Sequence, residues 1–173
     1  KTIRATLARQ RSLILDLYFN ECAVISAKLS QSVDCATFSQ GMLDKIEEYR
    51  GIFQNAYHAV PARHREMPYR VFLRLVQQRL QSTYDDDIYP YEKVEQLIED
   101  IELIAESLSC NKGRHAGLFV VRRLLRRIRA FGFHMVTLDV RQDAEVHRKV
   151  VGECLGDENW LERTAAERAE RII

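Results

Sequence analysis

The chain has 173 residues, of which 46% are hydrophobic and 29% are charged, and its formal net charge is +1 at pH 7. This balance is that of a globular protein with one core, and the near-zero charge gives no electrostatic reason to expect nucleic acid or an acidic membrane as partner. No apolar run reaches the roughly 18 residues of a membrane span, so we expect no membrane contact and a cytoplasmic location.

Glycine and proline are scarce in this chain, with seven and three residues. Their scarcity favours helices over the many turns that an all-β fold needs. The cysteines are widely spaced, without the close pairs of a zinc site or a redox motif. They are Cys22, Cys35, Cys110 and Cys154. We therefore expect buried, reduced thiols rather than disulfides or metal ligands.

Two long helices are predicted in the first third of the chain. Apolar residues recur at helical spacing over about residues 2–29 and again over about 39–57. Thr37 or Ser39 can cap the second helix. A loop with Pro61 and Pro68 follows. Its two histidines lack acidic or cysteine companions, so we predict no metal site there.

Three further helices are predicted over residues 69–84, 91–109 and 116–130. The first carries Arg70 on its polar side. The acidic residues of the second are expected to form a solvated outer face rather than a catalytic or metal site. They are Glu92, Glu95, Glu99, Asp100, Glu102 and Glu106.

The third of these helices is strongly basic, with an arginine stripe along one side. The stripe comprises Arg122, Arg123, Arg126, Arg127 and Arg129. We favour pairing of these arginines with acidic residues of the neighbouring helices. The alternative is a self-standing helical interaction module that uses helix 116–130 to bind an acidic partner or nucleic acid.

A short strand is predicted next, over about residues 134–140, after a turn at Gly132. Arg141 follows at the strand's carboxyl end. In barrels and open sheets that end is where anionic substrates bind, so Arg141 is a candidate ligand for a phosphate or carboxylate. The alternative is a salt bridge from Arg141 to Asp139 or Asp143.

A helix is predicted over residues 143–155, with Asp143 as its N-cap and Gly156 at its end. His147 lies one turn into this helix, where it either orients Gln142 or a ligand or serves as a satisfied cap residue. The stretch 164–167 is a capping box that starts a last helix. The chain stops soon after it, so we expect a fragment of a longer protein.

Residues 131–147 resemble a segment of the phosphoenolpyruvate carboxylase family. That segment reads Phe-Gly, four or five mixed residues, Leu-Asp-Ile-Arg-Gln-Glu-Ser and a His three residues on. The matching residues here are Phe131, Gly132, Leu138, Asp139, Arg141, Gln142 and His147. Asp143 and Ala144 depart from the family's Glu and Ser. The Pro-Tyr-Arg helix, the acidic helix and a Leu-Gly followed by Trp160 also occur in the family's order.

The resemblance implies that residues 1–173 form a single, mainly helical fragment from the first half of a larger enzyme, which is built around a helix-rich α/β (TIM-like) barrel. The enzyme joins bicarbonate to phosphoenolpyruvate with Mg²⁺ or Mn²⁺, through carboxyphosphate and an enolate, to give oxaloacetate and phosphate. This anaplerotic reaction feeds the tricarboxylic acid cycle. The resemblance further implies an allosteric homotetramer.

The same resemblance assigns roles to individual residues. It implies that Arg141 holds the substrate phosphate, supported by Asp139, Gln142 and His147. In plant members an arginine at the position of Arg70 belongs to a site for an activating sugar phosphate. The family's catalytic Thr-Ala-His-Pro, its Gly-Arg-Gly-Gly loop and its two metal-binding carboxylates have no match here. We therefore expect no catalytic residue or metal ligand in this chain, and no turnover by the chain alone.

Overall fold

The computed structural model describes residues 2–111, 113–136 and 143–171, which fall into two compact units, residues 1–136 and 137–173. Both units are helical, and no strand occurs within those described ranges. The prediction of a mainly α chain is therefore confirmed. The larger barrel and the assignment of residues 1–173 to a single enzyme domain stay predictions.

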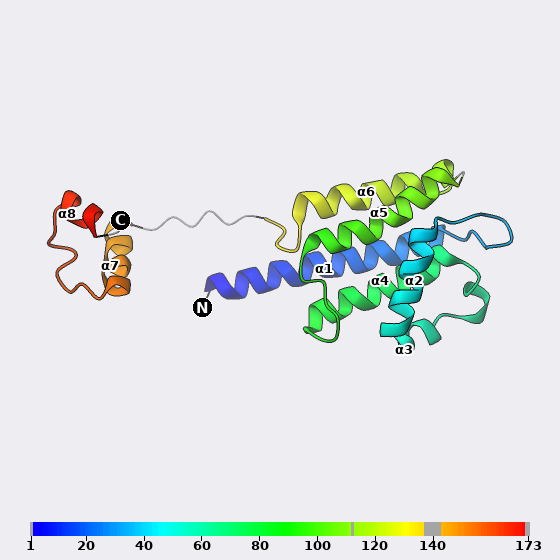
Figure 1. Cartoon of the computed structure of the whole chain (residues 1–173), viewed down its shortest axis with the longest axis horizontal. Helices are drawn as coiled ribbons and strands as arrows, with labels where there is room; N and C mark the ends of the chain where they lie inside the picture. Colours follow the sequence, from blue (N-terminus) through cyan, green and yellow to red (C-terminus); the bar gives the residue numbers. More distant parts are fainter. Residues whose placement is uncertain (1, 112, 137–142, 172–173) are drawn as a thin grey trace. The chain divides into compact units, whose positions relative to one another are not determined.

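Four long helices form the body of the first unit: α1 (Thr2–Lys28), α4 (Pro68–Asp85), α5 (Val94–Cys110) and α6 (Leu118–Phe131). Successive members run antiparallel (Figure 1). Helix α1 contacts α4 and α6, and α5 contacts the same two helices. The four helices therefore close on themselves as a bundle, which is the arrangement expected when antiparallel amphipathic helices bury their apolar faces together.

Helix α4 is the central element of this unit. It contacts α1, α2 (Gln40–Ile52), α3 (Gln54–His58) and α5, and twelve of its eighteen residues are buried. Pro68 occupies its first turn, where a missing N–H costs nothing. Burial of each large apolar side chain, such as Phe72 or Leu75, contributes about 1.5–3 kcal/mol to the stability of the fold. The bundle is therefore built around α4.

The predicted helix over residues 39–57 is in fact two helices, α2 and α3, separated by Phe53. Phe53 has φ −106° and ψ 52°, outside the helical region. Its side chain is buried and packs edge-on against Tyr49 and Tyr89. Burial of this ring explains a break that helical periodicity alone does not reveal. Short 3₁₀ turns, η1 (Ala62–His64) and η2 (Gly113–His115), occupy two of the connections.

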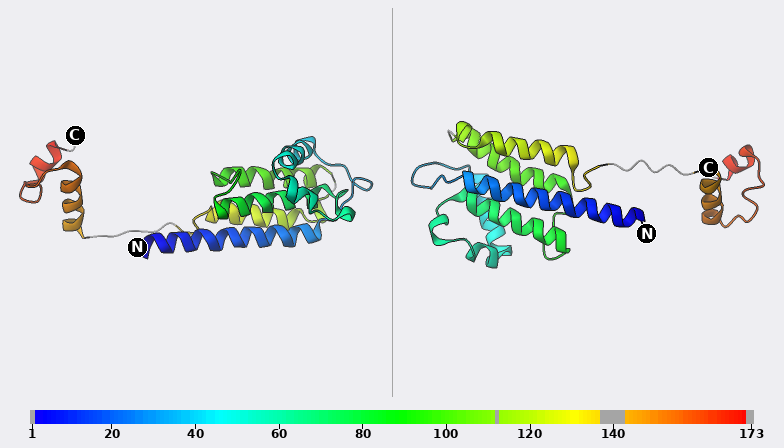
Figure 2. Two further views of the ribbon diagram at one scale, coloured as in Figure 1. Left: turned by 90° about the horizontal axis from the view of Figure 1, so that it is seen from below. Right: turned by 180° about the vertical axis from the view of Figure 1, so that it is seen from behind.

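Helix α1 is longer than its neighbours, and its N-terminal turns extend past them (Figures 1 and 2). Ile14 and Leu15 are buried, whereas Leu13 and Leu17 are 50% and 36% exposed. Over this stretch α1 therefore buries one side and leaves the other partly exposed. None of the described helices combines the length and apolar character needed to cross a membrane.

The cysteines also differ from expectation. Cys22 is buried, as predicted, but Cys35, Cys110 and Cys154 are exposed, and all four thiols are free. Cys35 lies in a turn and Cys110 is the last residue of α5, so neither position faces the bundle core. The prediction of burial is therefore confirmed for Cys22 and wrong for the other three cysteines, and the reduced state stays a prediction.

The second unit contains α7 (Ala144–Leu155) and α8 (Ala165–Glu170). Both predicted caps are present. Asp143 accepts a bond from the N–H of Glu145 at 2.7 Å, and Thr164 forms a capping box with Glu167. Gly156, with φ +64°, ends α7 as predicted. Trp160 is 3% exposed and packs on Gly152, where a Cβ would lie 2.7 Å from the tryptophan Cβ. Trp160 is therefore the packing centre of this unit.

The predicted strand over residues 134–140 is not formed in its described part. Gly132 ends α6 with φ +53°, as the predicted turn requires. Residues 134–136 then form a turn and bend, and Met135 has φ +66°, which an extended strand excludes. The remaining residues of the predicted strand, 137–140, lie outside the described residues.

Candidate functional site

Three of the predicted substrate-site residues, Asp139, Arg141 and Gln142, lie outside the described residues. Their predicted roles stay predictions. His147 is described: it lies in the first turn of α7, its side chain is exposed, and its N–H donates to the carbonyl oxygen of Asp143 at 3.1 Å. An exposed histidine at this place is accessible to a ligand.

Helix α7 begins at Ala144, three residues after Arg141 in the sequence. The first N–H groups of a helix carry partial positive charge, and one of them is taken by the Asp143 carboxylate. Asp143, which stands where the family has glutamate, therefore caps α7.

Arg70, the predicted anion-site residue, is engaged by three partners at the end of α1. Its Nε donates to the carbonyl oxygen of Leu29 at 3.2 Å, and its Nη2 donates to that of Ala27 at 3.1 Å. Its Nη1 lies 2.8 Å from Nε2 of His64. Arg70 thus satisfies carbonyls that the helix terminus leaves without partners, where a cation is favoured.

A cavity of about 270 Å³ adjoins Arg70 and is also lined by His64, Arg74 and Gln77. Partial burial and the charges of Arg70 and Arg63 lower the pKa of His64. A neutral His64 can accept the bond from Arg70, which leaves Arg74 as the exposed cation of this cavity. The surroundings are basic, and the assignment of Arg70 to an anion site stays a prediction.

The most strongly perturbed ionisable groups belong to a buried cluster that sequence reasoning missed. Arg79 and Asp100 are 3% and 1% exposed, and Arg79 Nη1 lies 3.8 Å from Asp100 Oδ2. The same carboxylate oxygen accepts bonds from the hydroxyls of Tyr49 at 2.7 Å and Tyr91 at 2.5 Å. Arg79 in turn donates to the Tyr49 hydroxyl at 2.5 Å. The expectation that Asp100 lies on the solvated acidic face is therefore wrong.

Arg79 also fixes the connection between α4 and α5. Its guanidinium lies 4.4 Å from the ring centroid of Tyr89 and 4.0 Å from that of Tyr91. It donates to the carbonyl oxygens of Tyr89 and Pro90 at 3.3 and 3.4 Å. Burial raises the pKa of Asp100, and bonds from Tyr91 and Tyr49 and the charge of Arg79 oppose that rise. This closed cluster is suited to holding the fold rather than to catalysis.

The sequence did contain a sign of this cluster. Asp100 is three residues after Leu97 and four before Ile104, so it lies on the apolar face of α5. Arg79 is likewise three residues after Val76 on the apolar face of α4. Charged residues at such positions are seldom buried unless they are paired. An acidic residue on the apolar face of one helix and a basic residue on the apolar face of its neighbour together indicate an internal ion pair.

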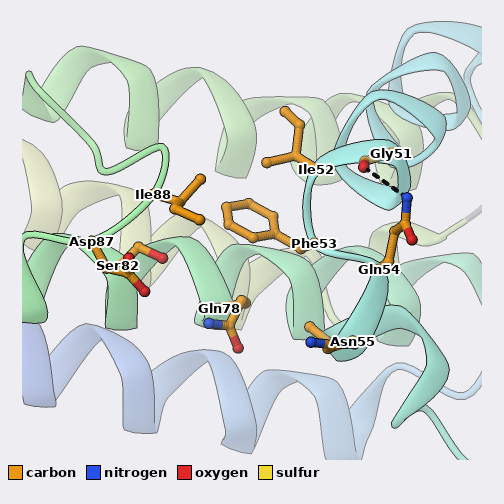
Figure 3. Close-up of a pocket in the computed structure, with 10 residues that line it drawn as sticks. Gly51, Ile52, Phe53, Gln54, Asn55, Gln78, Ser82, Asp87 and Ile88 are labelled. Carbon is orange, nitrogen blue, oxygen red and sulfur yellow. Dashed lines mark hydrogen bonds between the residues drawn. The ribbon is translucent and has the colours of Figure 1, made fainter.

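A second cavity, of about 370 Å³, lies where the α2–α3 junction meets α4 (Figure 3). Phe53 and Ile88 lie side by side in it, and Gln78 and Ser82 line its α4 side. Asp87 is the ionisable residue among its lining residues. Without converging acids, bases or nucleophiles, these walls give no arrangement for catalysis.

Three of the five stripe arginines pair with acidic residues of neighbouring helices, as favoured from the sequence. Arg127 Nη1 lies 2.5 Å from Oε1 of Glu21 on α1, and Arg123 Nη2 lies 3.6 Å from Oε2 of the same residue. Arg129 forms an ion pair with Glu102 of α5. This pairing uses part of the basic stripe within the bundle.

The family match and the related proteins found by comparison of the sequence all carry the same description. Residues 1–172 match the family described as phosphoenolpyruvate carboxylase. A phosphoenolpyruvate carboxylase from Xanthomonas euvesicatoria is 43% identical over 98% of this chain and 19% of its own length, and one from Xanthomonas campestris is 42% identical over 97% and 19%. One from Bradyrhizobium diazoefficiens is 30% identical over 91% and 17%. The chain thus spans about a fifth of the length of these relatives.

Proposed function

Because this chain belongs to the phosphoenolpyruvate carboxylase family, we propose that the longer protein that contains it joins phosphoenolpyruvate and bicarbonate into oxaloacetate and phosphate. The observation that carries the proposal is the family match over residues 1–172. The Leu-Asp-Val-Arg-Gln run, residues 138–142, lies within that match, and its Leu138, Asp139, Arg141 and Gln142 agree with the family's segment.

In this proposal Arg141 binds the phosphate group of phosphoenolpyruvate. A guanidinium suits this task because its planar donors match two phosphate oxygens and its charge persists at physiological pH. The same cation stabilises negative charge that develops as the phosphoryl group is transferred. Asp139 and Gln142 orient it, and His147 and the α7 N-terminus border the bound anion.

The metal ion of the reaction, Mg²⁺ or Mn²⁺, is proposed to bind residues outside this chain. Asp100 does not fit the role of a ligand, because two tyrosines and Arg79 already occupy it. Across residues 2–111, 113–136 and 143–171, no group of three or more potential ligand side chains is placed to hold a metal ion.

We extend the proposal to the context of the enzyme. The parent is a cytoplasmic, allosteric homotetramer whose product replenishes the tricarboxylic acid cycle, and the isolated chain is inactive because the main catalytic motifs have no match in it. Arg70 is a weaker candidate for an effector site, because its guanidinium already caps α1. Pairing of the α6 arginines within the bundle gives no support to the nucleic-acid alternative.

An assay of the full-length protein tests the proposal. Oxaloacetate is measured by coupling its reduction to NADH oxidation, with phosphoenolpyruvate, bicarbonate and Mg²⁺ supplied, and phosphate release is measured in parallel. We expect equal amounts of both products, dependence on bicarbonate, and no activity from the 173-residue chain. Phosphate release without oxaloacetate, or no reaction by the full-length protein, would refute the proposed activity.

A further inference from the structure

Two exposed thiols open onto one cavity in the first unit. The cavity has a volume of about 440 Å³ and is lined by residues 33–37 together with Cys110 and Asn111. Cys35 lies in a turn, where its N–H donates to the carbonyl oxygen of Ser32 at 3.0 Å. Cys110 ends α5. Because both cysteines are exposed and free, a reagent in solution can reach either thiol.

The two walls of this cavity are already bonded to each other. Thr37 Oγ1 lies 2.5 Å from Asn111 Oδ1. Thr37 is two residues after Cys35, and Asn111 directly follows Cys110. The N–H of Ser39 donates to Ser107 Oγ at 3.1 Å. These contacts keep two segments of the chain adjacent although about 70 residues separate them in sequence. The two thiols are therefore held at a shared site rather than exposed at unrelated places.

Two thiols at one site could bind a metal or exchange with a disulfide. A closed zinc site needs four ligands, and the chain as described has no group of three or more His, Cys, Asp or Glu side chains suitably placed. A dithiol without further ligands is instead suited to oxidation, because one cysteine can resolve a mixed disulfide formed on the other.

We propose that Cys35 and Cys110 form a reversible disulfide across this cavity when the protein meets a small-molecule disulfide such as oxidised glutathione. One cysteine thiolate attacks a sulfur of the reagent, whose S–S bond breaks, and the departing glutathione thiolate takes up the proton. The other cysteine attacks the mixed disulfide and releases the second glutathione. The two protein thiols lose two electrons, which reduce the reagent to two thiols.

A disulfide between the two cysteines also has a geometric requirement. A disulfide requires the two Cα atoms to approach within about 4.4–6.8 Å. Cys35 and Cys110 line one cavity, and Thr37 contacts Asn111 beside them, so the segment that carries Cys35 lies next to the end of α5. The bond then ties the α1–α2 connection to α5. Because it closes a long loop in the unfolded chain, it raises the temperature at which the first unit unfolds.

Peptide mapping of the full-length protein tests this inference. The protein is incubated with oxidised glutathione, free thiols are blocked, and tryptic peptides are analysed without reduction. Cleavage after Lys28, Lys45, Lys93 and Lys112 gives the peptides 29–45 and 94–112, which contain Cys35 and Cys110. We expect these two peptides to be linked, and to separate after treatment with dithiothreitol.

Variants at exposed positions make the test specific. Cys35→Ser and Cys110→Ser should each abolish the linked peptide and retain glutathione on the remaining cysteine, whereas the matched control Cys154→Ser should leave the link unchanged. Retained helical circular dichroism shows that each variant folds. Stable glutathione adducts on both cysteines without a link, or links between separate molecules only, would overturn the proposal.

Discussion

Replacing Asp100 by alanine should destabilise the bundle more than any ordinary surface change on α5. The substitution removes a carboxylate that accepts bonds from Tyr49 and Tyr91 and lies 3.8 Å from Arg79. Arg79 is 3% exposed, so its charge stays buried without its counter-charge. Breaking a buried pair in this way costs about 3–5 kcal/mol, a large share of the roughly 5–15 kcal/mol that stabilises a typical domain.

The assay is urea unfolding of the 173-residue chain, followed by far-ultraviolet circular dichroism. Trp160 fluorescence is unsuitable, because the sole tryptophan lies in the second unit. Glu99→Ala is the matched control, because it removes an exposed carboxylate from the position just before Asp100 in α5. It should change the free energy of unfolding by less than about 0.5 kcal/mol. Asp100→Asn keeps the side-chain volume and one hydrogen-bond acceptor, so its loss of unfolding free energy should fall between those of Asp100→Ala and Glu99→Ala.

A double variant distinguishes the effect of an unpaired buried charge from the effect of lost side-chain volume. Arg79→Leu combined with Asp100→Leu removes both charges and leaves neither unpaired, so it should cost less than the sum of the two single changes. If Asp100→Ala and Glu99→Ala unfolded at the same urea concentration, the ion pair would not hold the bundle and our interpretation would be wrong.

Three further predictions concern single sites. Burial raises the pKa of Cys22 to about 12, so a thiol reagent near pH 8 should label the exposed cysteines of the native chain and reach Cys22 only after denaturation; labelling of native Cys22 would disprove its burial. Gly152→Ala should push Trp160 outward, shift its fluorescence to the red and lower the free energy of unfolding by about 1–3 kcal/mol. An unchanged spectrum would exclude the close packing of Trp160 on Gly152. The Arg163 hydrogen bond lowers the pKa of Asp157 below its usual 3.8, so this carboxylate stabilises the fold above about pH 4 and loses that contribution as pH falls through the lowered pKa. Asp157→Asn should therefore flatten the acid unfolding curve followed by Trp160 fluorescence, and an unaltered curve would contradict this.

The helices could be predicted because each one repeats the same pattern over several turns. Helix α4 repeats buried apolar residues at helical spacing from Tyr69 to Leu80, and Asp143 and Thr164 stand where caps are needed. Such local, repeated patterns do not depend on which element packs against which. They allowed prediction of the mainly helical fold and of most helix ends.

The places where the structure differs from the prediction depend on tertiary contacts that a single sequence does not reveal. Asp100 is buried because Arg79 and Tyr49, from other helices, face it. The break at Phe53 depends on the aromatic rings around its side chain. Residues 134–136 look like the start of a strand, yet Met135 adopts a positive φ after the turn at Gly132. In each case one residue's neighbours outweigh its local preference.

The proposed phosphate contact of Arg141 predicts a specific kinetic loss in the full-length enzyme. Arg141→Ala should raise KM for phosphoenolpyruvate or lower turnover, reducing kcat/KM by about 100-fold if one charge-assisted contact worth about 3 kcal/mol is lost. Arg148→Ala, which removes an exposed arginine from α7, should leave both constants near those of the unaltered enzyme.

The steady-state kcat/KM for phosphoenolpyruvate, compared between the Arg141→Ala and Arg148→Ala enzymes, is therefore the most direct measurement. A loss confined to Arg141→Ala, with the fold retained, is the predicted result. Equal kcat/KM values in the two variants would contradict the role assigned to Arg141.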